Sequence, residues 1–193
     1  AGKGVAGGVG VWLGVAGGVG GSVAVAVAVC VGVGVSVGVA VAVVQWGASG
    51  ETRVVVPFIW LENSMHAKAF GFRAGLIQRW IRASATSIAA GIDDSVELVR
   101  ANEFEGQRKV IDVSGDGQDC SGADLVAARE KARAAGITIN GLSIASDDKG
   151  LEEYYRQDVI IGSDAFVEPA RDFEDFARAI KEKLLRELTP LAS

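Results

Sequence analysis

Between Val23 and Val43 every odd position of this chain is valine, and Ala, Gly, Ser or Cys fills the positions between. A period of two in β-branched residues predicts a strand. A single strand over these positions would run roughly 70 Å at ~3.3 Å per residue, several times the usual strand length. The chain has 193 residues, enough for one domain of ordinary size. One continuous strand of this length does not fit inside such a domain.

The same segment belongs to a region, residues 1–44, with a composition of its own. It holds 17 Val, 13 Gly and 8 Ala, and Lys3 is the sole charged residue before Glu51. Three interpretations stay open: a membrane segment, a genuine low-complexity repeat, and a stretch whose letters do not stand for the native side chains. We favour the third, because the composition returns abruptly to that of a globular protein around Gln45. No chemistry is therefore drawn from residues 1–44.

The rest of the chain predicts strands and helices in alternation. An apolar run at residues 39–46 and a β-rich run at 52–61 predict a hairpin, with Pro57 typical of an edge strand. Later strands are expected at 109–114, 137–144 and 165–168, and helices from 63 or 64, at 86–102, 123–135, 151–157 and 172–188. This order predicts one domain of the α/β class, with a mostly parallel sheet covered by helices on both faces.

Composition excludes several classes of function. Acidic residues outnumber basic ones 24 to 19, and the net charge of −5 argues against a nucleic-acid-binding surface. A single histidine, His66, excludes any catalytic or zinc site that needs two. The cysteines, Cys30 and Cys120, are too few for a disulfide scaffold, and we expect them not to be bonded to each other.

The most informative stretch is the run VIDVSGDG at residues 110–117. Ligands of open parallel sheets bind at the carboxyl ends of strands, where Asp116 falls between two glycines. A carboxylate there suits a hard divalent cation, although a turn or a helix cap is an equal alternative.

Four further residues are candidates for a functional or structural role. Thr86, at a predicted helix start, favours an N-cap role. Asp112, inside an apolar strand, must be paired, either in a structural ion pair or behind the Asp116 loop. His66 is expected to be a solvated surface residue. Cys120 lies on the Asp116 loop without a nearby histidine, which favours an inert thiol.

Taken together, the runs RKVIDVSGDG and AAREKARAAGITINGLSI, with the stretch from Glu152 to Leu185, resemble bacterial proteins that have a von Willebrand factor A-like domain. The resemblance covers about residues 39–188. It implies a doubly wound sheet with one antiparallel edge strand and a metal-ion-dependent adhesion site at the carboxyl edge. It also implies that residues 5–35 form a strand end, a loop and a long helix, and that the protein is exported to the periplasm.

The resemblance assigns metal ligands to two residues of this chain, Thr86 and Asp116. Gly115, Gly117 and Ser87 are expected to face a partner, with Asp112 behind the ligands. The family's first metal-binding loop, Asp-x-Ser-x-Ser, would fall at or just before residues 1–5, where the chain reads AGKGV, without carboxylate or hydroxyl.

These observations predict a non-enzymatic binding module. It would hold Mg²⁺, or Mn²⁺ or Ca²⁺, and capture a carboxylate of a partner protein. We expect neither nucleic acid nor membrane as a partner. Two alternatives stay open: a structural subunit of a larger complex with a non-functional metal site, and a hydrolase-like enzyme that uses Asp116 and Cys120.

Overall fold

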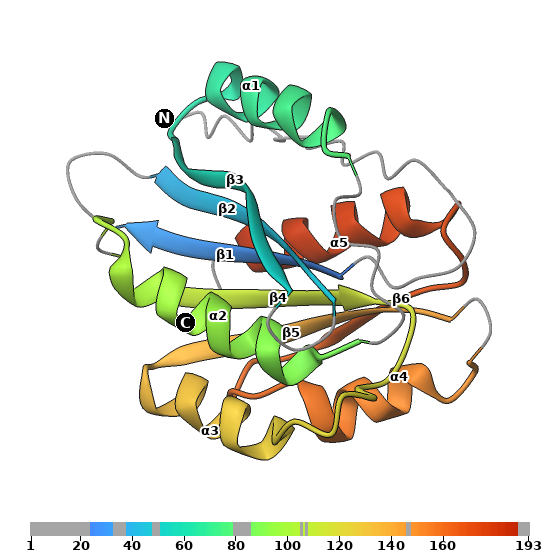
Figure 1. Cartoon of the computed structure of the whole chain (residues 1–193). Helices are drawn as coiled ribbons and strands as arrows, with labels where there is room; N and C mark the ends of the chain where they lie inside the picture. The colour runs from blue at the N-terminus through green and yellow to red at the C-terminus, as the bar shows by residue number, and fades with distance from the viewer. Residues whose placement is uncertain are drawn as a thin grey trace, which may run out of the picture.

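The computed structural model describes residues 24–32, 38–47, 51–78, 86–104, 106, 108–145 and 148–188. They form one six-stranded sheet with helices on both faces (Figure 1). The strands, in the spatial order β3-β2-β1-β4-β5-β6, are β1 (Ala24–Gly32), β2 (Gly38–Trp46), β3 (Thr52–Leu61), β4 (Arg108–Gly115), β5 (Ile137–Ile144) and β6 (Val167–Ala170). The α/β class predicted from the sequence is confirmed.

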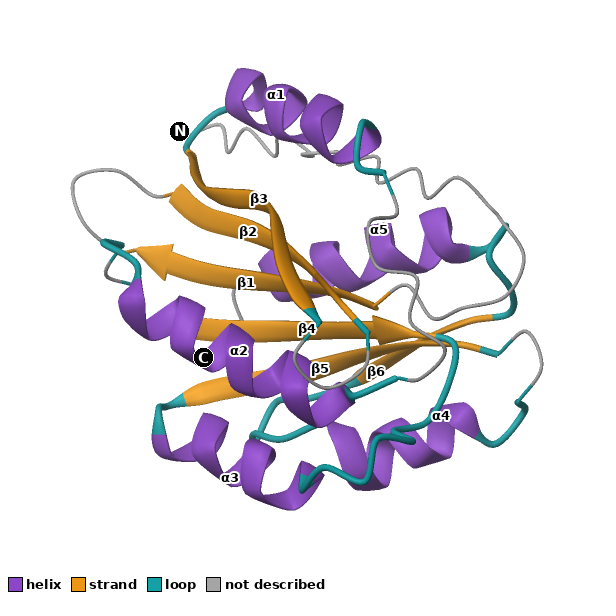
Figure 2. Cartoon of the chain, viewed as in Figure 1, coloured by secondary structure: helices purple, strands orange, loops and turns teal. Residues whose placement is uncertain are grey.

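Five α-helices and one π-helix complete the described part of the chain. They are α1 (Ser64–Gly75), α2 (Ile88–Ala101), α3 (Leu125–Ala134), α4 (Leu151–Tyr154), the π-helix η1 (Tyr155–Val159) and α5 (Phe176–Leu188). Helices α2, α3 and α4 cover one face of the sheet, and α1 and α5 cover the other (Figure 2). Each face has its own apolar core, centred on Ile92, Ile111 and Ile139 on the first face and on Val43, Leu142 and Ile180 on the second.

The predicted hairpin is confirmed. β2 and β3 pair antiparallel, with Val39 opposite Leu61 and Trp46 opposite Thr52. β3 lies at the edge of the sheet, a position in which a strand tolerates a proline such as Pro57. Gly136, at φ +68°, ends α3 in the left-handed conformation that glycine adopts without strain.

The sheet is mixed, which corrects the expectation of a mostly parallel sheet with one antiparallel edge strand. β4, β5 and β6 run parallel, whereas β1 pairs antiparallel with both β2 and β4. For β1 and β2 the cause is the short connection, because the valine alternation is divided between these two strands with only residues 33–37 between them. A parallel crossover needs a dozen or more residues, so strands joined this closely pair antiparallel.

The expectation of a long helix within residues 5–35 is wrong where the structure describes this segment, because Ala24–Gly32 is a strand. Cys30 accordingly lies on β1 and not near the end of a helix. The remaining residues of that prediction, and those near the chain start, lie outside the described residues. Among the described residues no helix is long and apolar enough to cross a membrane.

Candidate functional site at the end of strand β4

The loop that follows β4 starts beneath a buried tyrosine. A Cβ atom on Gly115 would lie 2.7 Å from the hydroxyl oxygen of Tyr155, so only glycine fits this close approach. Tyr155 is fully buried, and this burial, with smaller contributions from Tyr154 and Asp116, raises the pKa of its hydroxyl far above the usual range. The phenol therefore stays neutral, and the loop leaves the sheet over a fixed, uncharged surface.

On one side, the loop is fastened to the first turn of α2. The Asp119 carboxylate accepts a hydrogen bond from the backbone N–H of Ala89 (3.0 Å) and another from that of Ser121 (3.1 Å). The Ser121 and Ser87 hydroxyl oxygens lie 2.9 Å apart. Asp119 thus satisfies a backbone donor that an isolated helix start leaves unpaired.

On the other side, the loop contacts the segment after β5. The Tyr154 hydroxyl accepts a hydrogen bond from the backbone N–H of Asp119 (3.1 Å). Burial is the main cause that raises the pKa of Tyr154, so this phenol also stays protonated. The Gln118 side-chain amide donates to Asp148 at 2.9 Å. The loop is therefore held from two neighbouring elements, and its backbone has little freedom.

Asp116 lies inside this fastened loop, and one of its oxygens has no partner. The Oδ1 atom is buried and receives no hydrogen bond from any described residue. Two hydroxyls at the same ends of the strands are buried and unpaired in the same way, those of Ser114 on β4 and Ser143 on β5. A buried polar atom without a partner costs free energy, so its retention calls for an explanation such as a ligand.

Thr86 lies just before α2 and is buried. Its backbone is joined to the Asp116 loop, because the N–H of Cys120 donates to the Thr86 carbonyl oxygen at 3.0 Å. The N-cap of α2 is Ser87, whose hydroxyl accepts from Ala90 N–H at 3.2 Å, so Thr86 does not take the predicted capping role. The structure thus places the loops of both predicted metal ligands, Thr86 and Asp116, against each other.

The residues predicted to face a partner are less accessible than expected. Ser87 is fully buried, and its hydroxyl is used by α2 and by Ser121. Gly115 is also buried, under Tyr155, whereas Gly117 is partly exposed. The expectation for Ser87 and Gly115 is therefore corrected, because both positions serve the packing of the loop. Of these three residues, only Gly117 is partly exposed.

Asp112 lies on the opposite face of the sheet, in a fully buried ion pair with Lys183 of α5. The Lys183 ammonium also contacts Glu187 at 2.6 Å, and Asn140 donates to that same carboxylate at 2.7 Å. Burial and the nearby Glu187 raise the pKa of Asp112 well above its usual value. Burial opposes ionisation of Glu187 too, but the Lys183 ammonium lowers its pKa. Asp112 is thus an ion-pair residue that joins β4 to α5.

The two remaining candidates lie apart from each other. Cys120 is a free, exposed thiol that accepts from the Thr86 N–H at 3.2 Å, so it is not bonded to Cys30. His66, the one histidine of the chain, lies on α1, which packs on β3, and its Nδ1 is 3.9 Å from a Glu62 oxygen. The described residues therefore place no histidine beside Cys120.

Residue-type reasoning missed the groups that immobilise the loop, Asp119, Ser121 and Tyr154. A signal for the first two was present, because Asp and Ser in a polar loop are typical capping residues. Nothing in the sequence indicates that the segment they cap is α2, some 30 residues away. No sequence pattern indicates the role of Tyr154, because it depends on the hydrogen bond with Asp119 in the folded chain.

One protein-family profile matches most of the chain. The profile of DUF1194, described as "Protein of unknown function", matches residues 19–192. The chain belongs to the DUF1194 family. The match spans every described strand and helix. No curated protein and no solved structure matches the chain. Within the described residues, no group of three or more His, Cys, Asp or Glu side chains is arranged to hold a metal ion.

Proposed function

We propose that this member of the DUF1194 family is a von Willebrand factor A-like binding module that captures a carboxylate of a partner protein through a divalent cation. The observation that carries the proposal is the buried Asp116 Oδ1 without a partner among the described residues. Its loop neighbours Gln118, Asp119 and Ser121 all have hydrogen-bond partners. Asp116 is the acidic oxygen that this arrangement leaves available.

The donor set fits a hard cation that keeps much of its water. Asp116 would supply the charged oxygen and Thr86 a hydroxyl, and both belong to loops that hydrogen-bond to each other. Mg²⁺ is commonly bound through one or two carboxylates and several waters, so a site with a single carboxylate is chemically reasonable and weak. When bound, the cation would offer an open position to a carboxylate of the partner. Gly117, partly exposed beside Asp116, gives that carboxylate room to approach.

The resemblance to von Willebrand factor A-like domains supports the location of this site. Asp116 follows the carboxyl end of a strand that has a parallel neighbour, which is where open α/β sheets bind ligands. Helices on both faces agree with the doubly wound arrangement that the resemblance implies. Export to the bacterial periplasm is part of the same proposal and rests on the resemblance alone.

The alternatives differ in what they require of the site. A structural subunit with a non-functional metal site needs no ligand at Asp116, so cation binding separates it from the binding module. A hydrolase would need a general base near Cys120. No observation favours the hydrolase, because the one histidine of the chain is on α1.

The test is isothermal titration calorimetry of the full chain with Mg²⁺, Mn²⁺ and Ca²⁺. We expect weak binding of at least one cation, which D116A abolishes while circular dichroism shows an unchanged fold, because Asp116 is on a loop. T86A should weaken binding and T86S should restore most of it, since serine keeps the hydroxyl. The matched control is D164A, which removes an exposed carboxylate elsewhere. Absence of binding by all three cations would leave the structural subunit as the remaining function.

A further inference from the structure

Helix α1 is apolar on two opposite sides. Its inner side packs Ala67, Phe70 and Ala74 against the sheet. Its outer side carries Met65, Phe72 and Leu76, whose exposed fractions are 69%, 71% and 64%. At about 100° per residue, the spacing of seven and four positions places these three in one stripe, centred opposite the buried side. An ordinary surface helix has a polar outer face instead.

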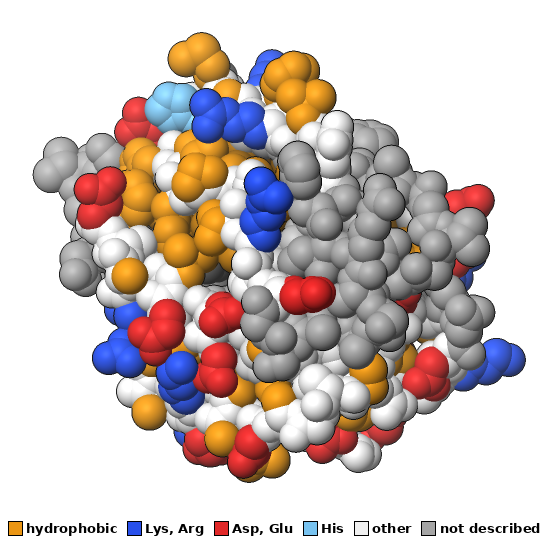
Figure 3. All heavy atoms as spheres, in the orientation of Figure 1, with side chains coloured by type: hydrophobic (Ala, Val, Ile, Leu, Met, Phe, Trp, Pro, Cys, Tyr) orange, Lys and Arg blue, Asp and Glu red, His pale blue; other side chains and the backbone are white. Residues whose placement is uncertain are grey.

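This outer stripe stands out from the rest of the described surface. Figure 3 shows hydrophobic side chains at the top of the molecule, where Figure 1 places α1 as the outermost element. Three of the large exposed hydrophobic residues lie on this helix and its C-cap, Leu76, and the others are dispersed over β3, α3, α5 and the segment before α5. Single exposed apolar residues are ordinary, whereas a continuous row along one helix is typical of an interaction surface.

Cations lie on both sides of the stripe. By helical spacing, Lys68 falls on one side of it and Arg73 on the other, and both are exposed. Helix α1 contains no Asp or Glu, and no ion pair of the described residues includes Lys68 or Arg73. Along the chain, the acidic residue nearest to the helix is Glu62, which precedes it and lies near His66. A helix without any acidic residue is unusual in a chain of net charge −5.

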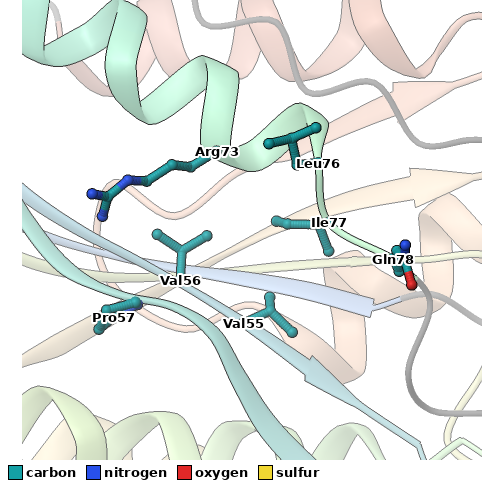
Figure 4. A pocket seen from close by; sticks show the side chains of 7 residues that line it. All are labelled: Val55, Val56, Pro57, Arg73, Leu76, Ile77 and Gln78. Atoms are coloured by element: carbon teal, nitrogen blue, oxygen red, sulfur yellow. The ribbon is translucent and has the colours of Figure 1, made fainter.

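A pocket adjoins the carboxyl-terminal end of the stripe. It has a volume of about 360 Å³ and lies between β3 and the end of α1. Figure 4 shows Val55, Val56 and Pro57 on the β3 side, with Arg73, Leu76, Ile77 and Gln78 on the other. Leu76 of the stripe and Arg73 beside the stripe also line the pocket, so one ligand can contact both. An apolar cavity with a guanidinium beside it suits an apolar side chain that neighbours a carboxylate.

The cations and the pocket together favour one kind of occupant over two others. A second copy of this chain is disfavoured, because a twofold pairing of α1 with α1 would bring four cations together without an acidic residue on either helix. A flat lipid surface would cover the stripe but leave the pocket unfilled. We propose that the outer face of α1 and the adjoining pocket bind an acidic amphipathic segment of a partner protein. Its apolar side chains would cover Met65, Phe72 and Leu76, and its carboxylates would pair with Lys68 and Arg73.

The test uses two synthetic helical peptides that differ only in charge. Both carry leucine at positions i, i+4, i+7 and i+11, and the flanking positions are Glu in one and Lys in the other. Fluorescence anisotropy with the full chain, in the presence of chelator, should show binding of the Glu peptide and not of the Lys peptide. The triple variant M65S/F72S/L76S should weaken binding of the Glu peptide at least about tenfold. The double variant K68E/R73E should exchange the preference of the two peptides.

The matched control is V126S, which removes an equally exposed valine from α3 and should leave binding unchanged. Circular dichroism of each variant separates lost binding from lost fold. The proposal is overturned if the two peptides bind equally or neither binds. It is also overturned if vesicles of anionic lipid compete for the same residues, or if light scattering shows a dimer that F72S dissociates. The chelator makes the result independent of the cation site at Asp116.

Discussion

The two halves of the sheet are stabilised in different ways. In the antiparallel half, the buried residues of β2 and β3 are apolar apart from Gln45, among the side chains that the structure describes there. In the parallel half, β4 and β5 bury Asp112, Ser114, Asn140 and Ser143. Buried polar groups cost free energy unless they are paired, so packing alone does not explain why β4 and β5 retain these residues. The difference gathers most of the buried polar groups of these four strands on β4 and β5, the strands beside the proposed site.

Within the parallel half, the buried polar groups differ in how they are satisfied. Asp112 and Asn140 are tied into the cluster of Lys183 and Glu187 on the α5 face. Ser114, Ser143 and the Asp116 Oδ1 atom, at or just beyond the ends of the same strands, have no partner among the described residues. The polar groups in the middle of these strands are therefore held in one structural cluster, apart from one carboxylate oxygen each of Asp112 and Glu187, whereas those at the carboxyl ends belong to no such cluster among the described residues.

The largest effect should come from breaking the buried ion pair of the parallel half. K183M removes the cation and leaves the carboxyl groups of Asp112 and Glu187 buried together, which should cost about 3–5 kcal/mol of unfolding free energy. Urea denaturation measures this loss. The matched control K181M changes an exposed lysine of the same helix and should shift stability by less than about 0.5 kcal/mol.

A second variant tests whether the cost lies in the unpaired acids. D112L/K183M/E187L replaces the three ionisable groups with apolar side chains and should recover much of the stability that K183M loses, because it leaves no unpaired charge, although Asn140 loses its acceptor on Glu187. If K183M proves as mild as K181M, the two halves of the sheet do not differ in the way that we describe.

A smaller effect is expected from overpacking the antiparallel half. A Cβ atom on Gly91 of α2 would lie 2.7 Å from the Trp46 ring of β2, and that ring is buried. Overpacking costs about 1–3 kcal/mol, and part of this is offset by the helix propensity of alanine, about 1 kcal/mol better than glycine. G91A should therefore destabilise the protein by at most about 2 kcal/mol in thermal or urea unfolding.

The control for this variant is G75A, at the end of α1, where no atom lies within 4 Å of the added Cβ. It should be neutral or stabilising by a few tenths of a kcal/mol. Equal destabilisation by both substitutions would show that backbone preference, and not contact with Trp46, sets the cost.

Local pattern was sufficient to predict much of the fold. The strands Thr52–Leu61 and Ile137–Ile144 were predicted with the bounds that the structure has, because β-branched runs between turn residues carry their own signal. Strand β1 was not predicted. The resemblance implied a helix in this segment, although the valine alternation itself indicated a strand. For residues 24–32, the local valine pattern therefore predicted the secondary structure better than the family resemblance did.

The candidate site was predictable only in part, for a physical reason. Asp116 could be located from its glycines and its place after a strand. The partner of Asp112 could not, because Lys183 is 71 residues away and is an ordinary-looking lysine of an amphipathic helix. Likewise, whether the Asp116 carboxylate has a partner depends on contacts made by every neighbouring loop. Residue types locate candidate groups, whereas tertiary contacts decide which of them remain available.

The last expected effect is a gradual one, the dependence of stability on pH, and it sharpens the comparison because among the described residues it is traced to Asp112 in the parallel half. The pKa of Asp112 is raised in the folded state by burial and by Glu187, so between about pH 4 and that raised pKa the folded chain holds a proton that the unfolded chain has lost. Stability should therefore fall as pH rises through this window, by at most about 1.4 kcal/mol per pH unit. Glu187, whose pKa is lowered, acts in the opposite sense below about pH 4.3 and does not mask the effect.

D112N carries no titrating proton and should flatten the slope above pH 4.5 in urea denaturation series, whereas D94N, on the exposed side of α2, should keep it. A slope that persists in D112N would mean that the proton is held elsewhere, and that the buried acids of β4 and α5 do not set the pH response.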